Sequence, residues 1–382
     1  MLRDPTDARP IWADVDLGAI SHNIALIRER AGRPVKMMVP VKANAYGHGA
    51  AVVGKHLESL GVDGVATANV ADAVAIRAAC SGLRILLYGA QLPSGNAYVL
   101  QHDLTPTVYS LDSLQAVSGL AADSGRVVNV HIKADAGMGR IGVRLDETVA
   151  FAREVMRAPG VRLEGIYTHL PFSNSAGEQW SRRRLTAFTE VVRSIESEHR
   201  VSIDFVQAAA SSVFLQGLAD TLNTIAPGHM TFGLNPIVGG RAEDTGYRKA
   251  LTAVRGALIH VGRRYKGDDL AGTGPAGLAA DATVGVILLG IDNGYTPGRA
   301  DGRAYMLCRG QRCAVLSVSA EYTVIDITGV TGAVVGDPIT VIGADGGESI
   351  SVETVATQLG APSAAYWMMG LKNVPYRYTD SS

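Results

Sequence analysis

An alternation of short apolar runs with helical patterns, over roughly the first 235 residues, constrains the fold of this chain more than any other feature. Apolar runs that alternate with helices favour a parallel sheet, because each helix returns the chain to the same edge. Eight such units predict an α/β fold of the (β/α)8 TIM-barrel type. The candidate strands are 35–43, 62–67, 84–90, 105–110, 127–134, 162–170, 205–210 and 229–234.

The sequence pattern changes from about residue 245. Strand-like runs separated by glycine-rich turns dominate there, and only 351–360 has a helical pattern. We therefore predict two domains, a barrel over residues 1–245 and a mainly β domain over residues 246–382. A chain of 382 residues is long enough for two ordinary domains.

Composition and charge narrow the class of function. A formal net charge of -1 gives no electrostatic argument for a nucleic-acid or membrane-surface partner. The N-terminus lacks the apolar run of a signal peptide, and no stretch is apolar enough to span a bilayer. The odd, sparse set of Cys80, Cys308 and Cys313 predicts a reducing cytoplasm. No Cys or His pair completes a zinc site with these cysteines, so no metal is predicted.

One motif places a lysine at the end of an apolar strand. Lys42 lies in the run Val41-Lys42-Ala43-Asn44-Ala45-Tyr46-Gly47-His48-Gly49. Burial disfavours the charged ammonium and lowers the pKa of a lysine, which allows it to act as a base or a Schiff-base nucleophile. A lysine that merely extends from the strand end into solvent is the structural alternative, and the spacing alone favours it.

The barrel topology predicts where residues with such chemistry meet. Active sites of (β/α)8 barrels lie at the carboxyl ends of the strands. Five chemistry-bearing residues fall at or just past the predicted strand ends and should converge on one face: Lys42, Lys133, His169, Ser211 and Gly233.

A second motif follows the strand at 127–134. It reads Lys133-Ala134-Asp135-Ala136-Gly137-Met138-Gly139-Arg140-Ile141-Gly142. Its glycines and small residues allow the backbone to approach a ligand closely. Arg140 offers a planar fork of donors that suits a carboxylate or a phenolate. Taken alone, the segment would be interpreted as a surface loop with a solvated arginine.

Together these two motifs resemble those of the alanine racemase family. The string around Lys42 resembles the family's pyridoxal-phosphate (PLP) lysine motif, and 133–142 resembles its Lys-x-Asp-x-Gly-Met-x-Arg-x-Gly segment. The resemblance implies that Lys42 is the Schiff-base lysine and the base on one face of the substrate. It also implies that Arg140 lies near the cofactor's phenolic oxygen and the substrate carboxylate. In the family, the lysine at position 133 is often carbamylated and orients this arginine.

The resemblance extends to residues expected to hold the phosphate of PLP. It runs from about residue 10 to 375. Tyr46, four residues after Lys42, is expected to hydrogen-bond the phosphate. Ser211 matches a phosphate-binding serine, and the backbone N–H groups of Gly233 and Leu234 match donors to the same phosphate.

Two further matches concern the ring and the partner subunit. His169, in Tyr167-Thr168-His169-Leu170, matches a histidine that lies close to the cofactor ring. Tyr295, in Asp292-Asn293-Gly294-Tyr295, resembles a tyrosine that enters the partner subunit's site, although the aspartate that follows it in the family is missing here. The resemblance therefore implies a homodimer whose sites are shared across subunits.

Departures from the family pattern fall on residues of the chemistry. The family's second base is a tyrosine in a Ser-Tyr-Gly segment, and Gly272 stands where this tyrosine is expected. The arginine that faces the pyridine nitrogen aligns with Thr231, and a phosphate-binding tyrosine aligns with Lys372. Loss of a fixed positive charge at the ring nitrogen changes how the cofactor accepts electrons.

Three interpretations of the function follow. The first is a PLP-dependent amino-acid racemase or epimerase, in which a substitute base reaches the second face of the substrate; Tyr265, His260 and Tyr295 are the candidates. The second is a PLP enzyme with single-base chemistry on an amino acid, namely aldol cleavage, decarboxylation, transamination or elimination. The third is a PLP-binding relative without catalysis. The sequence leaves the identity of the amino acid open.

Overall fold

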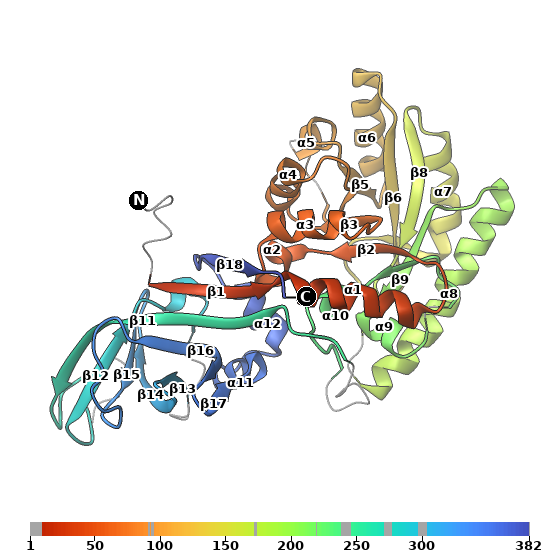
Figure 1. The fold of residues 1–382 in the computed structure, drawn as a ribbon. Coiled ribbons are helices and arrows are strands. Elements are labelled where there is room, and N and C mark those ends of the chain that lie inside the picture. Colours follow the sequence, from red (N-terminus) through yellow and green to blue (C-terminus); the bar gives the residue numbers. More distant parts are fainter. Residues whose placement is uncertain are drawn as a thin grey trace. The chain divides into compact units, whose positions relative to one another are not determined.

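The computed structural model describes residues 10–90, 92, 95–171, 174–218, 220–237, 246–270, 277–296 and 304–381. The chain divides into two compact units (Figure 1). The barrel unit comprises Ile20–Ala45 and Gly49–Arg248, and the β unit comprises Met1–Ala19, Tyr46–His48 and Lys249–Ser382. The predicted division at residue 245 stays a prediction, since residues 238–245 lie outside the described part.

The barrel unit contains a closed parallel sheet, as predicted. Each strand pairs in parallel with its neighbour, and pairing of β5 with β6 closes the ring. A two-residue strand, β7 (Val143–Arg144), adds to β6 outside the ring. The eight barrel strands are β2 (Lys36–Pro40), β3 (Gly64–Thr67), β4 (Ile85–Leu87), β5 (Thr105–Val108), β6 (Val128–Asp135), β8 (Val161–Tyr167), β9 (Phe205–Ala210) and β10 (Thr224–Ala226).

One predicted strand was wrong. The apolar run 229–234 is not a strand: its first residues belong to the short helix α10 (Gly228–Thr231). The eighth strand is the shorter β10, which ends just before Pro227. Proline has no N–H to donate to a strand ladder and the following glycine favours a turn, so this dipeptide ends the strand early.

Helices surround the barrel strands (Figure 1). Their amphipathic spacing buries one face, as in α7, where Phe151, Ala152 and Val155 are buried. Local signals fix their ends: the Ser110 side chain accepts from Ser113 N–H at the start of α6. The helices are α1 (Leu17–Ala31), α3 (Ala50–Ser59), α4 (Val70–Ala79), α5 (Asn96–Gln101), α6 (Leu111–Ser124), α7 (Thr148–Arg157), α8 (Ser175–His199) and α9 (Ser211–Leu215).

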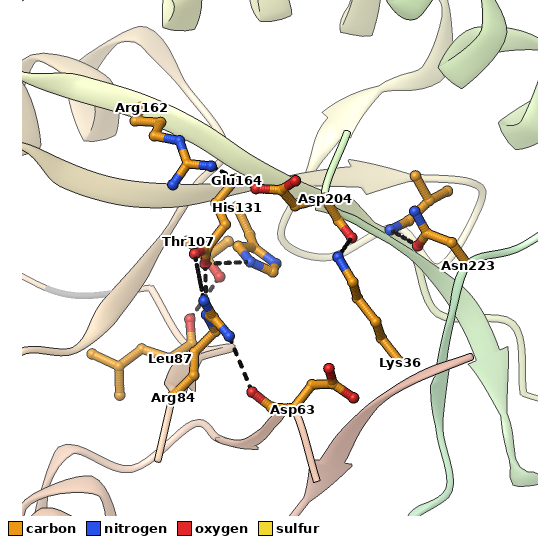
Figure 2. A network of polar contacts seen from close by, with 11 residues as sticks. Lys36, Asp63, Arg84, Leu87, Thr107, His131, Arg162, Glu164, Asp204 and Asn223 are labelled. Atoms are coloured by element: carbon orange, nitrogen blue, oxygen red, sulfur yellow. Dashed lines mark hydrogen bonds and ion pairs between the residues drawn. The ribbon is translucent and has the colours of Figure 1, made fainter. Parts of the chain in front are cut away.

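A polar network occupies the amino-terminal end of the barrel (Figure 2). The buried Glu164 carboxylate accepts from Arg84 Nε at 3.1 Å and contacts His131 Nε2 at 3.2 Å. Lys36 Nζ donates to the Asp204 carbonyl at 2.7 Å. We call these five residues the floor network. Because the buried Glu164 is paired with Arg84 and His131 at the end of the barrel opposite the expected site, the network is suited to a structural role.

The second unit is mainly β, as predicted. Its sheet includes β1, which pairs antiparallel with β11 and parallel with β18, so the N-terminal strand belongs to this unit. Its strands are β1 (Ile11–Asp16), β11 (Leu251–Arg264), β12 (Ala282–Ile287), β13 (Tyr305–Cys308), β14 (Gln311–Val318), β15 (Thr323–Asp326), β16 (Pro338–Asp345), β17 (Glu348–Ile350) and β18 (Tyr376–Thr379).

Two helices interrupt the strands of the β unit. The predicted helix at 351–360 is confirmed as α11 (Val352–Gln358), with the Ser351 side chain accepting from Thr354 N–H. A second helix, α12 (Ala364–Gly370), was not predicted. Within the described ranges, none of the helices combines the length and apolar character needed to cross a membrane.

Candidate active site

Lys42 lies just past the end of the buried strand β2, at the start of α2 (Lys42–Gly47). The four residues Ala43 to Tyr46 have φ between 53° and 55°, so this turn is left-handed. Left-handed helical conformation costs about 1–2 kcal/mol per residue for L-amino acids. Strain of this size persists only where the surroundings enforce it, and such segments cluster at functional sites.

Hydrogen bonds and a glycine hold this strained turn in place. The Asn44 side chain accepts from Ala50 N–H at 2.8 Å, and the Asp72 carboxylate accepts from Asn44 N–H at 3.2 Å. Gly47, with φ of 79°, ends the turn where an added Cβ would lie 2.1 Å from the Met368 carbonyl oxygen. The backbone and the side chain of Asn44 therefore both hold the turn that follows Lys42.

Residues from five strand ends meet around Lys42. In sheet order the strands are β2, β10, β9, β8 and β6, and these lead to Lys42, His229, Ser211, His169 and Lys133. The register pairs Thr224 with Lys36, five residues before His229 and six before Lys42, so these two lie at a similar height. The charges of Lys133, Lys42, Arg140 and His229 all act on His169, which places the predicted site residues together.

Positive charge dominates the electrostatics of this site. Burial and then the charge of Arg140 lower the pKa of Lys42. Burial and Arg140 also lower the pKa of Lys133, to about 7, against the opposing charge of Asp135. We call Lys42, Lys133 and Arg140 the cation cluster. Arg140 raises the cost of charging both lysines, which favours an anionic ligand.

Two histidines beside the cation cluster are neutral at pH 7. Burial and the charges of Lys133, Lys42 and Arg140 lower the pKa of His169 to about 3. Burial and Lys42 lower the pKa of His229 to about 4. Neutral imidazoles can exchange hydrogen bonds with a ligand without adding to the positive charge of the site.

Asp135 shapes the loop that carries Arg140. Its carboxylate accepts from the N–H groups of Gly137 at 2.8 Å, Met138 at 2.7 Å and Gly139 at 2.9 Å. Burial acts to raise the pKa of Asp135, but these donors hold it below its usual range. Because the acid is turned toward its own loop, it compensates the cation cluster only in part.

Ser211 lies between the ends of β9 and β10. Its hydroxyl oxygen accepts from Met230 N–H at 3.3 Å, which brings the first turn of α10 against the start of α9. The expected phosphate donors have other partners: Gly233 N–H donates to the Met230 carbonyl at 3.0 Å, and Leu234 N–H to the His229 carbonyl at 2.9 Å.

Thr231 and His229 both belong to α10, where the sequence predicted a strand. Thr231 is fully buried, and its hydroxyl donates to the Pro227 carbonyl within its own helix. His229 was not predicted at all, because it fell inside the run assigned as a strand. The Pro227-Gly228 dipeptide was the signal that could have placed His229 just past a strand end.

The remaining predicted residues belong to the β unit. Tyr46 is 3% exposed and Tyr295 is 1% exposed, and burial raises the pKa of Tyr295. Lys372 is exposed, and its carbonyl accepts from the Asn293 side chain at 3.2 Å. Two candidates for a substitute base, His260 and Tyr265, are exposed on or next to β11, and Gly272 lies outside the described residues.

Family models match almost the whole chain. Residues 15–236 match the alanine racemase N-terminal domain, and residues 252–378 match the alanine racemase C-terminal domain. The chain belongs to the alanine racemase family. This membership confirms the predicted family and the prediction of an enzyme of the amino-acid racemase type.

Individual relatives agree with this assignment. The alanine racemase of Streptococcus equi subsp. zooepidemicus is 31% identical over 372 residues, covering 97% of this chain and 98% of that protein. The alanine racemase of Methanococcus maripaludis is 28% identical over 373 residues, covering 97% and 99%.

Solved structures share the fold. The biosynthetic alanine racemase of Pseudomonas aeruginosa superposes with a TM-score of 0.78 at 29% identity, covering 97% of this chain and 99% of that chain. The alanine racemase of Bacillus anthracis with bound L-Ala-P gives a TM-score of 0.86 at 25% identity, covering 98% and 96%. Both likenesses extend over the barrel and the β unit.

Proposed function

We propose that this protein is a PLP-dependent amino-acid racemase or epimerase in which Lys42 holds the cofactor. The observation that carries the proposal is the cation cluster, with Lys42 at the end of a barrel strand and a lowered pKa. A lysine with a lowered pKa has more of the neutral amine that attacks a carbonyl.

The residues present fit PLP with an amino-acid substrate. Phosphate, phenolate and substrate carboxylate are anions, and Arg140 and Lys133 lie here beside Asp135, an acid that is engaged with its own loop. Ser211 would hold the phosphate. Arg140 would bind the phenolic oxygen or the substrate carboxylate, and His169 would support the ring.

Other contacts are proposed from the family resemblance. Tyr46 and Lys372 would add to the phosphate site, and Gly233 and Leu234 would join it only if their N–H groups were shared with their present acceptors. Thr231 would lie near the ring without donating to it, because its hydroxyl already donates to the Pro227 carbonyl. We further propose that the protein is a homodimer and that it is cytoplasmic. Each chain would divide into its two domains near residue 245.

Proton transfer at the substrate Cα is the chemistry that these residues must perform. PLP, when bound, stabilises the negative charge that develops at this carbon. Lys42 Nζ would take and return the proton on one face, and Arg140 would fix the carboxylate so that Cα faces the amine. Inversion requires a second proton carrier on the opposite face; Gly272 stands where the family carries its second-base tyrosine, so Tyr265, His260 and Tyr295 are the candidates for this role.

Single-base chemistry is the second candidate function. The observation in its favour is Gly272, which stands where the family carries its second-base tyrosine. In that case Lys42 alone would serve the reaction, and no group on the opposite face would be required.

Exchange of the Cα hydrogen with deuterated solvent distinguishes the candidates. The purified protein is incubated with PLP and a panel of L- and D-amino acids, and the products are analysed for isotope and configuration. Exchange with inversion is the expected result. Exchange without inversion supports single-base chemistry, and no exchange with any amino acid would overturn both proposals in favour of a binding protein.

A further inference from the structure

Lys133 lies over an aromatic ring inside the barrel. This lysine is buried, with 7% of its surface exposed, and its Nζ is 4.5 Å from the centroid of the Tyr167 ring. The face of an aromatic ring carries partial negative charge and attracts an ammonium group. Tyr167 therefore favours the charged form of Lys133, whereas burial and Arg140 favour the neutral form.

The Tyr167 ring is held rigidly. Its hydroxyl is 3.0 Å from Thr107 Oγ1, and Thr107 donates its own proton to the Leu87 carbonyl at 2.6 Å. Thr107 can then only accept, so the Tyr167 hydroxyl is the donor. One side of the ring packs against Tyr88, with centroids 5.1 Å apart. A ring fixed by a directed hydrogen bond and a tilted aromatic neighbour is a suitable platform for a lysine.

The platform rests on a column of side chains that begins at the floor. The His131 ring lies 6.5 Å from the ring of Tyr167 and 5.5 Å from that of Phe205. Phe205 in turn lies between two cations, with Arg84 at 4.7 Å and Lys36 at 4.6 Å. The column connects the floor network with the site through packed side chains, all within the barrel unit.

We propose that Tyr167 is a positioning residue: its ring holds the Lys133 amine and sets the fraction of that amine that is charged. The proposal deepens the proposed function, on which its consequence for catalysis rests. The charged groups that act on Lys133, besides Tyr167, are Arg140 and Asp135, and Lys133 in turn acts on the titratable group of His169.

A lysine whose pKa lies near 7 is sensitive to small changes around it. A buried cation–π contact is worth enough to move a pKa by about half a unit to one unit. Loss of the ring's negative face should therefore lower the pKa of Lys133 and leave it mostly neutral at pH 7. A neutral Lys133 would no longer repel Arg140, and the KM for substrate would lose its pH dependence near 7.

The test measures the pKa of Lys133 in the protein without cofactor. Lysine labelled with ¹³C at Cε is titrated by NMR in CO2-free buffer, and the Lys133 signal is assigned from Lys133→Met. Tyr167→Phe keeps the ring and should leave the pKa of Lys133 within about 0.3 units. Trifluorophenylalanine keeps the shape but weakens the negative face, and should lower the pKa by about 0.5 to 1 unit.

A control variant separates the effect of the Tyr167 ring from a general disturbance of the column. Phe205→Leu removes an aromatic ring of the same column that does not touch Lys133, and should leave the titration unchanged. Equal Lys133 pKa values with phenylalanine and trifluorophenylalanine at position 167 would overturn the proposal. The readout needs no PLP, so a protein that takes up no PLP but shows the expected titration refutes the proposed function and leaves the platform standing.

Discussion

Buried charged groups have opposite-charge partners at one end of the barrel and like-charge neighbours at the other. At the floor, the Glu164 carboxylate contacts both Arg84 and His131 at 3.1–3.2 Å, so a buried acid has two partners (Figure 2). At the carboxyl end, Lys42 and Lys133 have lowered pKa values because they are buried near Arg140. The buried acid at the floor therefore has its partners within the barrel, whereas the buried lysines at the site end lie near a further positive charge.

This difference distinguishes a structural cluster from a binding cluster. Removal of one partner from a paired buried cluster leaves an uncompensated charge and destabilises the fold. Removal of one member from a set of like charges relieves repulsion and should leave the fold intact while ligand binding is lost. Mutations at the two ends should therefore give opposite combinations of stability and activity.

The largest effect is expected at the site end. Arg140→Ala should lower kcat/KM by about 100- to 1000-fold, because a charge-assisted pair with the substrate is lost. The melting temperature should stay the same or rise, because repulsion within the cation cluster falls. Arg144→Ala, which removes an exposed arginine paired with Asp146, is the matched control and should change neither quantity. An Arg140→Ala protein that melts at a lower temperature than wild type but keeps full activity would contradict the comparison between the two ends.

A loss of stability is expected at the floor. Glu164→Gln keeps the side-chain shape but removes the charge that pairs with Arg84 and His131, and should cost about 2–3 kcal/mol in the free energy of unfolding. Urea denaturation measures this cost. Activity per folded molecule should be unchanged, and Asp146→Asn at the surface serves as control. Unchanged stability of Glu164→Gln would show that the floor network is not structural.

Lys133, at the site end of the barrel, should make the stability of the protein depend on pH above 7. The pKa of Lys133 is about 7 in the folded protein and near 10.5 in the unfolded chain, so between these values the unfolded state binds more protons. Stability of the cofactor-free protein should therefore rise from pH 7 to 10.5, by up to about 1.4 kcal/mol per unit. Lys133→Met should remove this rise; a wild-type slope that persists in the variant would contradict the assignment.

His169 and His229 should make the stability of the protein depend on pH below 7. His169 and His229 have folded pKa values of about 3 and 4, below the value near 6.5 of an unfolded chain. Stability should therefore fall as the pH drops from 6.5 toward 4, because the unfolded state takes up the protons. The double variant His169→Gln/His229→Gln should show a shallower acid limb in thermal melts from pH 4 to 7.

The smallest effect is expected at the edge of the floor. Lys36→Met removes a hydrogen bond to the Asp204 carbonyl and a cation over the Phe205 ring, and should cost about 1 kcal/mol. Thermal melts measure this cost. Lys36 begins the strand that Lys42 follows, so uptake of PLP unchanged from wild type would sharpen the distinction between the two ends.

The fold was predictable from the sequence where its signals are local. Eight apolar runs interleaved with helices predicted the closed barrel, and Ser351 predicted the start of α11. The place of β1 was not predictable, because its partner β11 lies more than 230 residues away and pairing at that distance has no local signal. The eighth strand was wrongly placed at 229–234, after the Pro227-Gly228 turn, whereas β10 lies before that turn.

The candidate site was predictable where a motif names the residue. Lys42 and Arg140 came from two motifs, and the structure brings them together. His229 was lost with the misplaced strand. The left-handed turn of α2 and the Tyr167 platform were not predictable, since both depend on tertiary packing that sequence periodicity does not encode.

Covalent capture of PLP tests the central claim most directly. The protein is incubated with PLP, reduced with borohydride, digested and analysed by mass spectrometry, with Lys42→Ala and Lys36→Met as variants. The account predicts a pyridoxyl group on the Lys42 peptide of wild type and Lys36→Met, and none in Lys42→Ala. A wild-type protein without the group on Lys42, or a Lys42→Ala protein labelled to the same extent elsewhere, would contradict it.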